Sequence, residues 1–181
     1  MRVIGGLAKG RKLLAVPGDT TRPILDRVKT PLFDILRPSL AGSRVLDLFA
    51  GSGSVGIEAL SQGAEHCTFV DLNSRAIETI RRNLESTGFI ENSEIRKTDA
   101  FLFLKKCGRE FDLIYIAPPQ YQTLWLQALQ HIAERPELVS AKGKLVIQID
   151  PKEYEPFESS DFCEADQRRY GNTMLAFFSR R

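Results

Sequence analysis

From Arg44 to Ile149, short apolar runs alternate with helical patterns, and this alternation limits the possible folds more than any other feature of the chain. The apolar runs are short and bounded by turn-forming residues, as is typical of buried strands. Between them, apolar side chains recur at helical spacing, as at Ala76, Ile80 and Leu84. Strand and helix in alternation are typical of βαβ units, which build a mostly parallel sheet with helices on its faces. We therefore predict an α/β fold.

The expected strands and helices can be placed from these patterns. Strands are predicted at 45–49, 67–70, 94–96, 113–116 and 144–149, and helices at 55–61, 100–106 and 124–133, with a further helix between Ser74 and Gly88 that contains 76–84. Ser74 is expected to cap its helix and Gly88 to lie beyond the end. In the tail, segments 166–170 and 173–178 flank Gly171-Asn172, which predicts a turn between two antiparallel strands.

The first forty-one residues form an extension with a different pattern. Segments 2–4 and 12–16 predict a β-hairpin, and a helix follows at 25–36, in which Pro31 predicts a kink or a late start. Up to Ala41 there are eight basic and three acidic side chains, although the whole chain carries only +2. Such a basic segment favours a phosphate backbone, or it is simply a solvated arm. We expect residues 1–41 to be the extension and 42–181 the main domain.

A glycine-rich loop lies between the first predicted strand and its helix. Gly51, Gly53 and Gly56 leave room for the backbone to approach a ligand. Their spacing also matches the dinucleotide fingerprint, and Asp71, twenty positions after Gly51, suits a ribose diol for either ligand. The glycine spacing therefore does not identify the cofactor.

Asp47 favours S-adenosylmethionine over a dinucleotide. Its carboxylate lies beside the loop, where it can meet the ammonium group of S-adenosylmethionine, whereas a negative group gains nothing near a pyrophosphate. The alternative is a strand-end carboxylate bonded to loop amides. Asp99 is placed to accept from an adenine amino group, with Phe101 or Leu72 against the ring, or to cap the helix that begins at Ala100. The candidate cofactor-binding residues are Asp47, Phe49, Gly51, Gly53, Asp71, Leu72, Asp99, Ala100 and Phe101.

The fourth predicted strand ends in Ala117-Pro118-Pro119-Gln120-Tyr121, our candidate catalytic segment. Methyltransferases that act on amino groups usually end this strand in Asp/Asn-Pro-Pro-Tyr/Phe. The prolines hold backbone carbonyls rigidly toward the target amine, and the aromatic ring stacks on an extruded base. Both features remain, but Ala117 offers no side-chain acceptor.

Three interpretations of Ala117 are open. Gln120 supplies the acceptor, or backbone carbonyls suffice, or the protein has lost activity. One lost charge-assisted hydrogen bond costs about 1.5–3 kcal/mol, which is roughly ten- to a hundredfold in rate. We therefore expect activity to be retained.

With these motifs in view, the chain resembles the bacterial RsmD family, which methylates N2 of one guanine, at position 966, in 16S ribosomal RNA. The resemblance covers nearly the whole chain and is carried by segments 2–6, 9–11, 21–23, 26–29, 32–36, 45–53, 56–60 and 170–173. It implies a class I S-adenosylmethionine-dependent methyltransferase fold, with a Rossmann-like, mostly parallel seven-stranded sheet and an antiparallel C-terminal strand.

The resemblance also implies a substrate, which is 16S rRNA in a partly assembled small ribosomal subunit. The basic hairpin would grip this RNA, and the segment from Arg22 to Lys29 would help to close the pocket. The candidate RNA-binding residues are Arg2, Lys9, Arg11, Lys12, Arg22 and Arg27.

Other functions fit the sequence less well. A DNA adenine-N6 methyltransferase shares the chemistry of the fourth strand but usually carries a recognition domain, for which 181 residues leave no room. Ala117 is compatible with a non-catalytic RNA-binding or ribosome assembly factor on the same fold. A nicotinamide-dependent dehydrogenase has no use for Pro118-Pro119.

Composition excludes further classes. Three dispersed cysteines and two histidines predict reduced packing residues and no metal site. The chain has no long apolar run and no signal-peptide pattern at its start. We expect a cytoplasmic monomer.

Overall fold

A computed structural model describes residues 1–18 and 24–181 of the chain. Its centre is a seven-stranded sheet with the order β3-β2-β1-β4-β5-β7-β6. The strands are β1 (Arg44–Leu48), β2 (His66–Asp71), β3 (Ser93–Lys97), β4 (Phe111–Ile116), β5 (Val139–Ile149), β6 (Phe162–Tyr170) and β7 (Thr173–Arg180). β1 to β5 pair in parallel, and β7 runs antiparallel to both β5 and β6. The predicted Rossmann-like sheet with an antiparallel C-terminal strand is confirmed.

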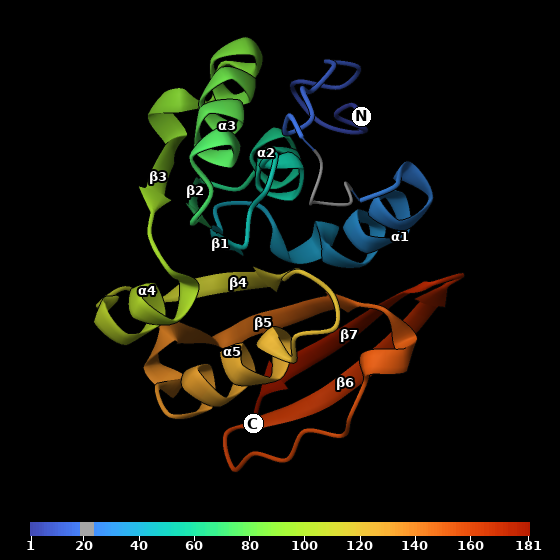
Figure 1. The fold of residues 1–181 in the computed structure, drawn as a ribbon, viewed down its shortest axis with the longest axis vertical. Coiled ribbons are helices and arrows are strands. Elements are labelled where there is room, and N and C mark those ends of the chain that lie inside the picture. The colour runs from blue at the N-terminus through green and yellow to red at the C-terminus, as the bar shows by residue number, and fades with distance from the viewer. Residues whose placement is uncertain (19–23) are drawn as a thin grey trace.

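Helices cover both faces of this sheet (Figure 1). The helices are α1 (Asp26–Leu36), α2 (Ser54–Ser61), α3 (Ser74–Thr87), α4 (Ala100–Lys106) and α5 (Leu124–Ala133), with short 3-10 turns at Arg37–Ser39, Ile90–Asn92, Pro136–Leu138 and Pro151–Glu153. Buried side chains of α1, α2 and α3 form one core with the N-terminal segment, and those of α4 and α5 form a second core on the opposite face. None of the helices in the described part of the chain is long and apolar enough to cross a membrane.

The strand order predicts a ligand-binding crevice at the carboxyl ends of the parallel strands. β1 lies between β2 and β4, so the order of the strands reverses at β1. In open parallel sheets, ligands bind beyond the carboxyl ends of the strands at such a reversal point. The loops that follow β1, β2 and β4, which contain most of the candidate site residues, all begin at this edge.

The two ends of α3 differ in how well they match the expectation. The cap of α3 is Asn73, whose side chain accepts from the Arg75 amide at 2.8 Å, while Ser74 is the first helical residue. Both residue types cap helices, but only Asn73 has the extended backbone that a cap requires. Gly88 follows the last helical residue, as predicted, and adopts the left-handed conformation. Pro31 lies inside α1, which begins at Asp26.

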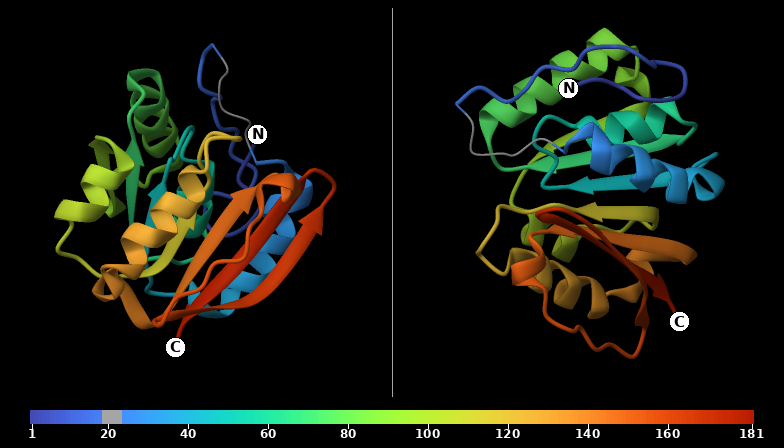
Figure 2. Two further views of the ribbon diagram at one scale, coloured as in Figure 1. Left: turned by 60° about the horizontal axis from the view of Figure 1, so that its bottom comes forward. Right: turned by 90° about the vertical axis from the view of Figure 1, so that its right-hand side faces the viewer.

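The N-terminal hairpin is present in reduced form. Its pairing consists of one antiparallel bridge between Arg2 and Lys12, flanked by hydrogen bonds from the Val3 amide to the Arg11 carbonyl at 2.9 Å and from the Leu13 amide to the Met1 carbonyl at 3.0 Å. The next amide, that of Leu14, donates to the Asn83 side chain at 2.8 Å. An isolated two-stranded hairpin is marginal in water, and this segment is held instead by contacts to α2 and α3. It runs along these two helices, as the right-hand view of Figure 2 shows.

Candidate active site

A cavity of about 700 Å³ opens at the carboxyl ends of the parallel strands. Its size lies within the range of ordinary ligand pockets. Its walls bring together most of the predicted cofactor and catalytic residues, namely Asp47, Phe49, Gly51, Asp71, Leu72, Asp99, Ala100, Phe101, Ala117, Pro118, Pro119 and Gln120. Gly53 and Tyr121 are not among the lining residues. Met1, Ala15, Val16 and Ile24 of the N-terminal segment complete the wall.

The loop after β1 has the backbone that its glycines permit. Gly51 and Gly53 have φ angles of 57° and 76°, in the left-handed region that disfavours residues with a Cβ. Gly56 has a different role, because a Cβ there would lie 2.3 Å from the Phe69 ring and force α2 away from β2. Two glycines therefore shape the loop, and the third allows close packing of helix on sheet.

Asp47 is buried at the end of β1 and lines the cavity. Its Oδ2 accepts from the Gly56 amide at 3.0 Å, so the bond to a loop amide that the sequence left open does exist. Burial raises the pKa of Asp47 from 3.8 to about 7; the Gly56 amide opposes this rise and the nearby Asp71 carboxylate adds to it. A buried carboxylate without a cationic partner gains strongly from a cationic ligand.

Asp71 at the end of β2 holds the loop in place. Its two oxygens accept from the Gly51 and Asn73 amides, each at 2.8 Å. A carboxylate has about four acceptor positions, so Asp71 retains capacity for a hydroxyl donor in the cavity. Both acids therefore stabilise the loop through backbone amides while facing the same cavity.

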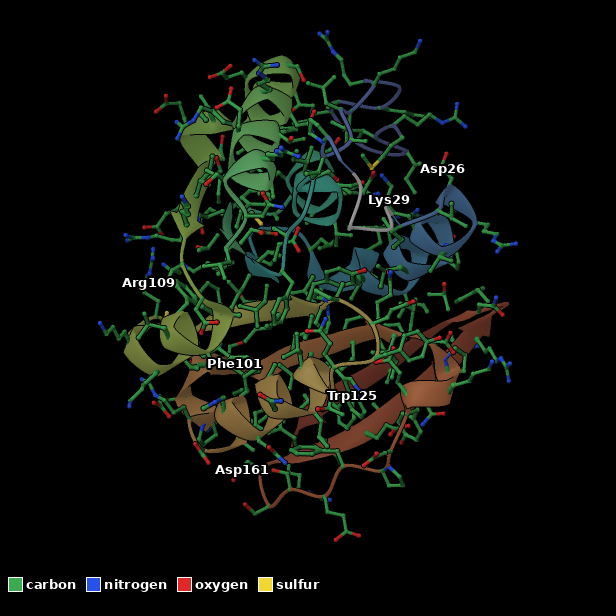
Figure 3. All side chains as sticks on the ribbon, in the orientation of Figure 1. Asp26, Lys29, Phe101, Arg109, Trp125 and Asp161 are labelled. Carbon is green, nitrogen blue, oxygen red and sulfur yellow. The ribbon has the colours of Figure 1, made fainter. Side chains whose placement is uncertain are left out.

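The adenine side of the predicted pocket contains an acid and two rings. Asp99 caps α4 by accepting from the Leu102 amide at 2.9 Å, so the capping role is confirmed. The rings of Phe49 and Phe101 meet edge to face with centroids 6.2 Å apart. Figure 3 shows Phe101 on the side of α4 toward α5, where it also contacts His131. Leu72 is exposed at the cavity mouth.

The first four residues of the segment after β4 line the cavity, and the fifth lies on the surface. Ala117, Pro118, Pro119 and Gln120 line the cavity. Tyr121 is 65% exposed, and its hydroxyl donates to Asp150 Oδ2 at 2.8 Å. The pKa of Asp150 lies below its ordinary value because the Lys152 amide and then the Tyr121 hydroxyl hydrogen-bond to the carboxylate. Tyr121 thus lies next to the cavity-lining segment, with its hydroxyl bound to the ionised Asp150 carboxylate.

The candidate RNA-binding residues lie on the surface of the N-terminal extension. Four are exposed on the segment that precedes α1, and Arg27 is exposed on α1 itself. The four are Arg2, Lys9, Arg11 and Lys12. Arg2 Nε lies 3.3 Å from Asp26 Oδ2. Arg22 lies outside the described residues. No group of His, Cys, Asp and Glu in the described ranges could hold a metal ion.

Two polar pairs were missed by sequence reasoning. Lys29 and Glu58 form a fully buried ion pair with Nζ and Oε2 3.0 Å apart, and Figure 3 shows Lys29 between α1 and the N-terminal segment. Tyr115 on β4 donates to Gln148 Oε1 on β5, and both line the cavity. The signal for the first pair was the single acid in the otherwise uncharged α2. The second had no sequence signal, since it depends on which strands are neighbours.

Comparison with known proteins identifies the family of this chain. A family model described as Conserved hypothetical protein 95 matches residues 1–179. YlbH from Bacillus subtilis is 38% identical over 184 residues, which cover 100% of both proteins. Ribosomal RNA small subunit methyltransferase D from Haemophilus influenzae is 35% identical over 159 residues, covering 86% of this chain and 81% of that protein.

The fold is shared with solved methyltransferase structures. The protein yhhF from Escherichia coli superposes with a TM-score of 0.87 at 28% identity, covering 100% of this chain and 98% of that one. The predicted fold of S-adenosylmethionine-dependent methyltransferases is therefore confirmed. The chain belongs to the family of Conserved hypothetical protein 95, the RsmD family whose motifs its sequence resembles.

Proposed function

We propose that this protein methylates the N2 amine of one guanine of 16S rRNA, at position 966, in a partly assembled small ribosomal subunit. The observation that carries the proposal is one cavity in which the acids at the ends of β1 and β2 face the Pro118-Pro119 end of β4. The name of the Haemophilus influenzae relative supports ribosomal RNA of the small subunit as the substrate. The choice of guanine N2 rests on the resemblance of the sequence motifs. We place the protein in the cytoplasm as a monomer.

The cofactor side of the cavity fits S-adenosylmethionine. Asp47 would face the ammonium group, Asp71 the ribose hydroxyls, and Asp99 the adenine amino group, with Phe101 and Leu72 beside the ring. When bound, S-adenosylmethionine supplies an electrophilic methyl group on a sulfonium. Among residues 1–18 and 24–181, the groups that shift the pKa of the buried Asp47 include no cation, as expected of a residue that meets a cationic ligand.

The acceptor side must hold and activate an amine whose lone pair is delocalised into the base. A backbone carbonyl of the Ala117-Pro118 segment would accept one N–H of the amine and help to draw the nitrogen toward tetrahedral geometry. Tyr121, exposed next to these prolines, would stack on the extruded base. Alignment supplies most of the rate, because the sulfonium is already electrophilic and its sulfur would depart as a neutral thioether.

Two parts of the chain would divide the work. Residues 42–181 would carry the methyl transfer, and residues 1–41 would grip the RNA and cover the cavity. Met1, Ala15 and Val16 already line the cavity, so the basic segment borders the site that an extruded base must enter.

The experiment is methyl transfer to small subunits isolated from cells that lack this protein. We expect incorporation of one methyl group per subunit, mapped by mass spectrometry to N2 of a guanine. Methylation of an adenine would contradict the proposed target. Binding of S-adenosylmethionine without any transfer would favour the non-catalytic assembly factor, the candidate that Ala117 supports.

Charge reversal in the basic segment gives a second prediction. The variant Lys9→Glu, Arg11→Glu, Lys12→Glu should bind 16S rRNA more weakly and with a smaller salt dependence, because each lost phosphate contact removes about 0.7–0.9 from the slope of log K against log[salt]. The matched control is Lys105→Glu, Lys106→Glu, Lys142→Glu, three exposed lysines remote from the N-terminal segment. Equal losses in both variants, measured by filter binding over a salt series, would reduce the segment to a solvated arm.

A further inference from the structure

We propose that Gln148 on β5 supplies the side-chain acceptor for the target amine that Ala117 on β4 lacks, and that Tyr115 holds its amide in place. The inference rests on the proposed function, since it assigns a residue to that reaction. Gln148 and Tyr115 both line the cavity that Ala117, Pro118 and Gln120 line.

The strand register places Gln148 beside Ala117. β4 and β5 pair in parallel with Tyr115 opposite Val146 and Ile116 opposite Ile147. One further step brings position 148 next to position 117. Side chains alternate between the faces of a sheet, so Tyr115, Ala117 and Gln148 share one face. An acceptor lost from the end of one strand is thus available from the neighbouring strand, at the same level and on the same side.

The contact with Tyr115 fixes the amide. Tyr115 is buried, and its hydroxyl donates to Gln148 Oε1. Burial, followed by the nearby Asp47 carboxylate, raises the pKa of Tyr115 well above its ordinary value, so the phenol keeps its proton and remains a donor. A carbonyl oxygen has two lone pairs, and the phenol occupies one. Gln148 Oε1 therefore keeps one acceptor position while its orientation is set.

Gln120 is the other candidate for this role, and its setting is less favourable. It is half-buried like Gln148, but it lies on the loop after Pro119 and not on a strand. Gln148 is half-buried within a central strand and already oriented. Groups held on rigid elements by a supporting hydrogen bond are better placed for catalysis than groups on loops.

The chemistry asked of Gln148 is modest. Its Oε1 would accept one N–H of the amine while a backbone carbonyl at the end of β4 accepts the other. The nitrogen lone pair then forms the new N–CH₃ bond as the S–CH₃ bond breaks, the bonding electrons stay on sulfur, and the nitrogen afterwards releases one proton to water. One acceptor of this kind is worth roughly ten- to a hundredfold in rate.

The test compares three glutamine substitutions in methyl transfer to unmethylated small subunits, with cofactor affinity measured separately by calorimetry. Gln148→Leu should lower kcat by about ten- to a hundredfold and leave the Kd for S-adenosylhomocysteine within about threefold. Gln148→Glu keeps an acceptor at the same place and should recover most of the rate. Gln127→Leu, an exposed glutamine on α5, is the matched control and should leave kcat unchanged.

A double-mutant cycle tests the positioning role of Tyr115. Tyr115→Phe should lower kcat in the wild-type background and have little further effect in the Gln148→Leu background, because the two side chains act as one unit. A large loss in Gln120→Leu together with full activity in Gln148→Leu would overturn the inference and assign the acceptor to Gln120. If the wild-type protein transfers no methyl group to guanine, both the proposed function and this inference are overturned. If the wild type is active and Gln148→Leu is equally active, only this inference is overturned.

Discussion

Replacing Lys29 with methionine is expected to lower the free energy of unfolding by about 3–5 kcal/mol, because it leaves a buried carboxylate without its counter-charge. Lys29 Nζ lies 3.0 Å from Glu58 Oε2, 2.6 Å from the Arg2 carbonyl oxygen and 3.1 Å from Ser54 Oγ. Both charged side chains have 0% exposure, so water cannot replace the lost partner. Urea unfolding at neutral pH measures the change as a shift of the midpoint.

The same substitution should loosen the N-terminal segment. Glu58 also accepts from the backbone amides of Ile4 and Gly5, at 2.9 Å and 2.8 Å, so the ion pair joins α1 and α2 to the segment that borders the cavity. Faster hydrogen exchange at these two amides is the expected sign.

A surface ion pair supplies the control for the Lys29 substitution. Arg82 and Glu78 are 3.0 Å apart on α3 but exposed, and Arg82→Met should change stability by about 0.5 kcal/mol or less. A Lys29→Met protein as stable as the wild type would show that hydration or rearrangement compensates the buried Glu58.

The architecture could be predicted because its signals are local. Strand and helix periodicities, Gly88 and the Gly171-Asn172 turn each act within a few residues, and a parallel sheet follows from their alternation. The cofactor side was predictable for a related reason. Asp47 and Asp71 lie at the carboxyl ends of β1 and β2, and Asp99 follows β3; the carboxyl ends of parallel strands meet on one side of the sheet.

What could not be predicted depends on contacts between distant segments. The Leu14 amide, just beyond the hairpin bridge, donates to Asn83, which is sixty-nine residues away in the chain. The orientation of Tyr121 depends on Asp150, and the acceptor proposed at Gln148 depends on β5 lying beside β4. Sequence reasoning looked for the missing acceptor at Gln120 because Gln120 is adjacent in the chain, whereas adjacency across the sheet is visible only in the fold.

Replacing Asp47 with asparagine is expected to stabilise the cofactor-free protein and weaken cofactor binding. The pKa of Asp47 is raised from 3.8 to about 7, so between these pH values the folded protein holds a proton that the unfolded chain has released. The free energy of unfolding of the wild type therefore falls as pH rises through this window, by a total on the order of 4 kcal/mol. Asparagine cannot ionise and can still accept from the Gly56 amide. The variant should thus melt several degrees higher than the wild type at pH 8, with the difference disappearing toward pH 4.

Cofactor binding should show the opposite preference. The ammonium group of the ligand requires the ionised carboxylate, and a pKa of about 7 leaves roughly one tenth of Asp47 ionised at pH 6 and nine tenths at pH 8. The affinity of the wild type for S-adenosylhomocysteine should rise about tenfold between these pH values, while the Asp47→Asn variant binds weakly at both. Calorimetry in buffers of different ionisation enthalpy measures the affinity and the proton released on binding. Asp34→Asn on the exposed face of α1 is the control and should follow the wild type. If Asp47→Asn bound as tightly as the wild type at pH 8, Asp47 would be a residue that only fastens the glycine loop, and the ammonium contact would have to be assigned elsewhere in the cavity.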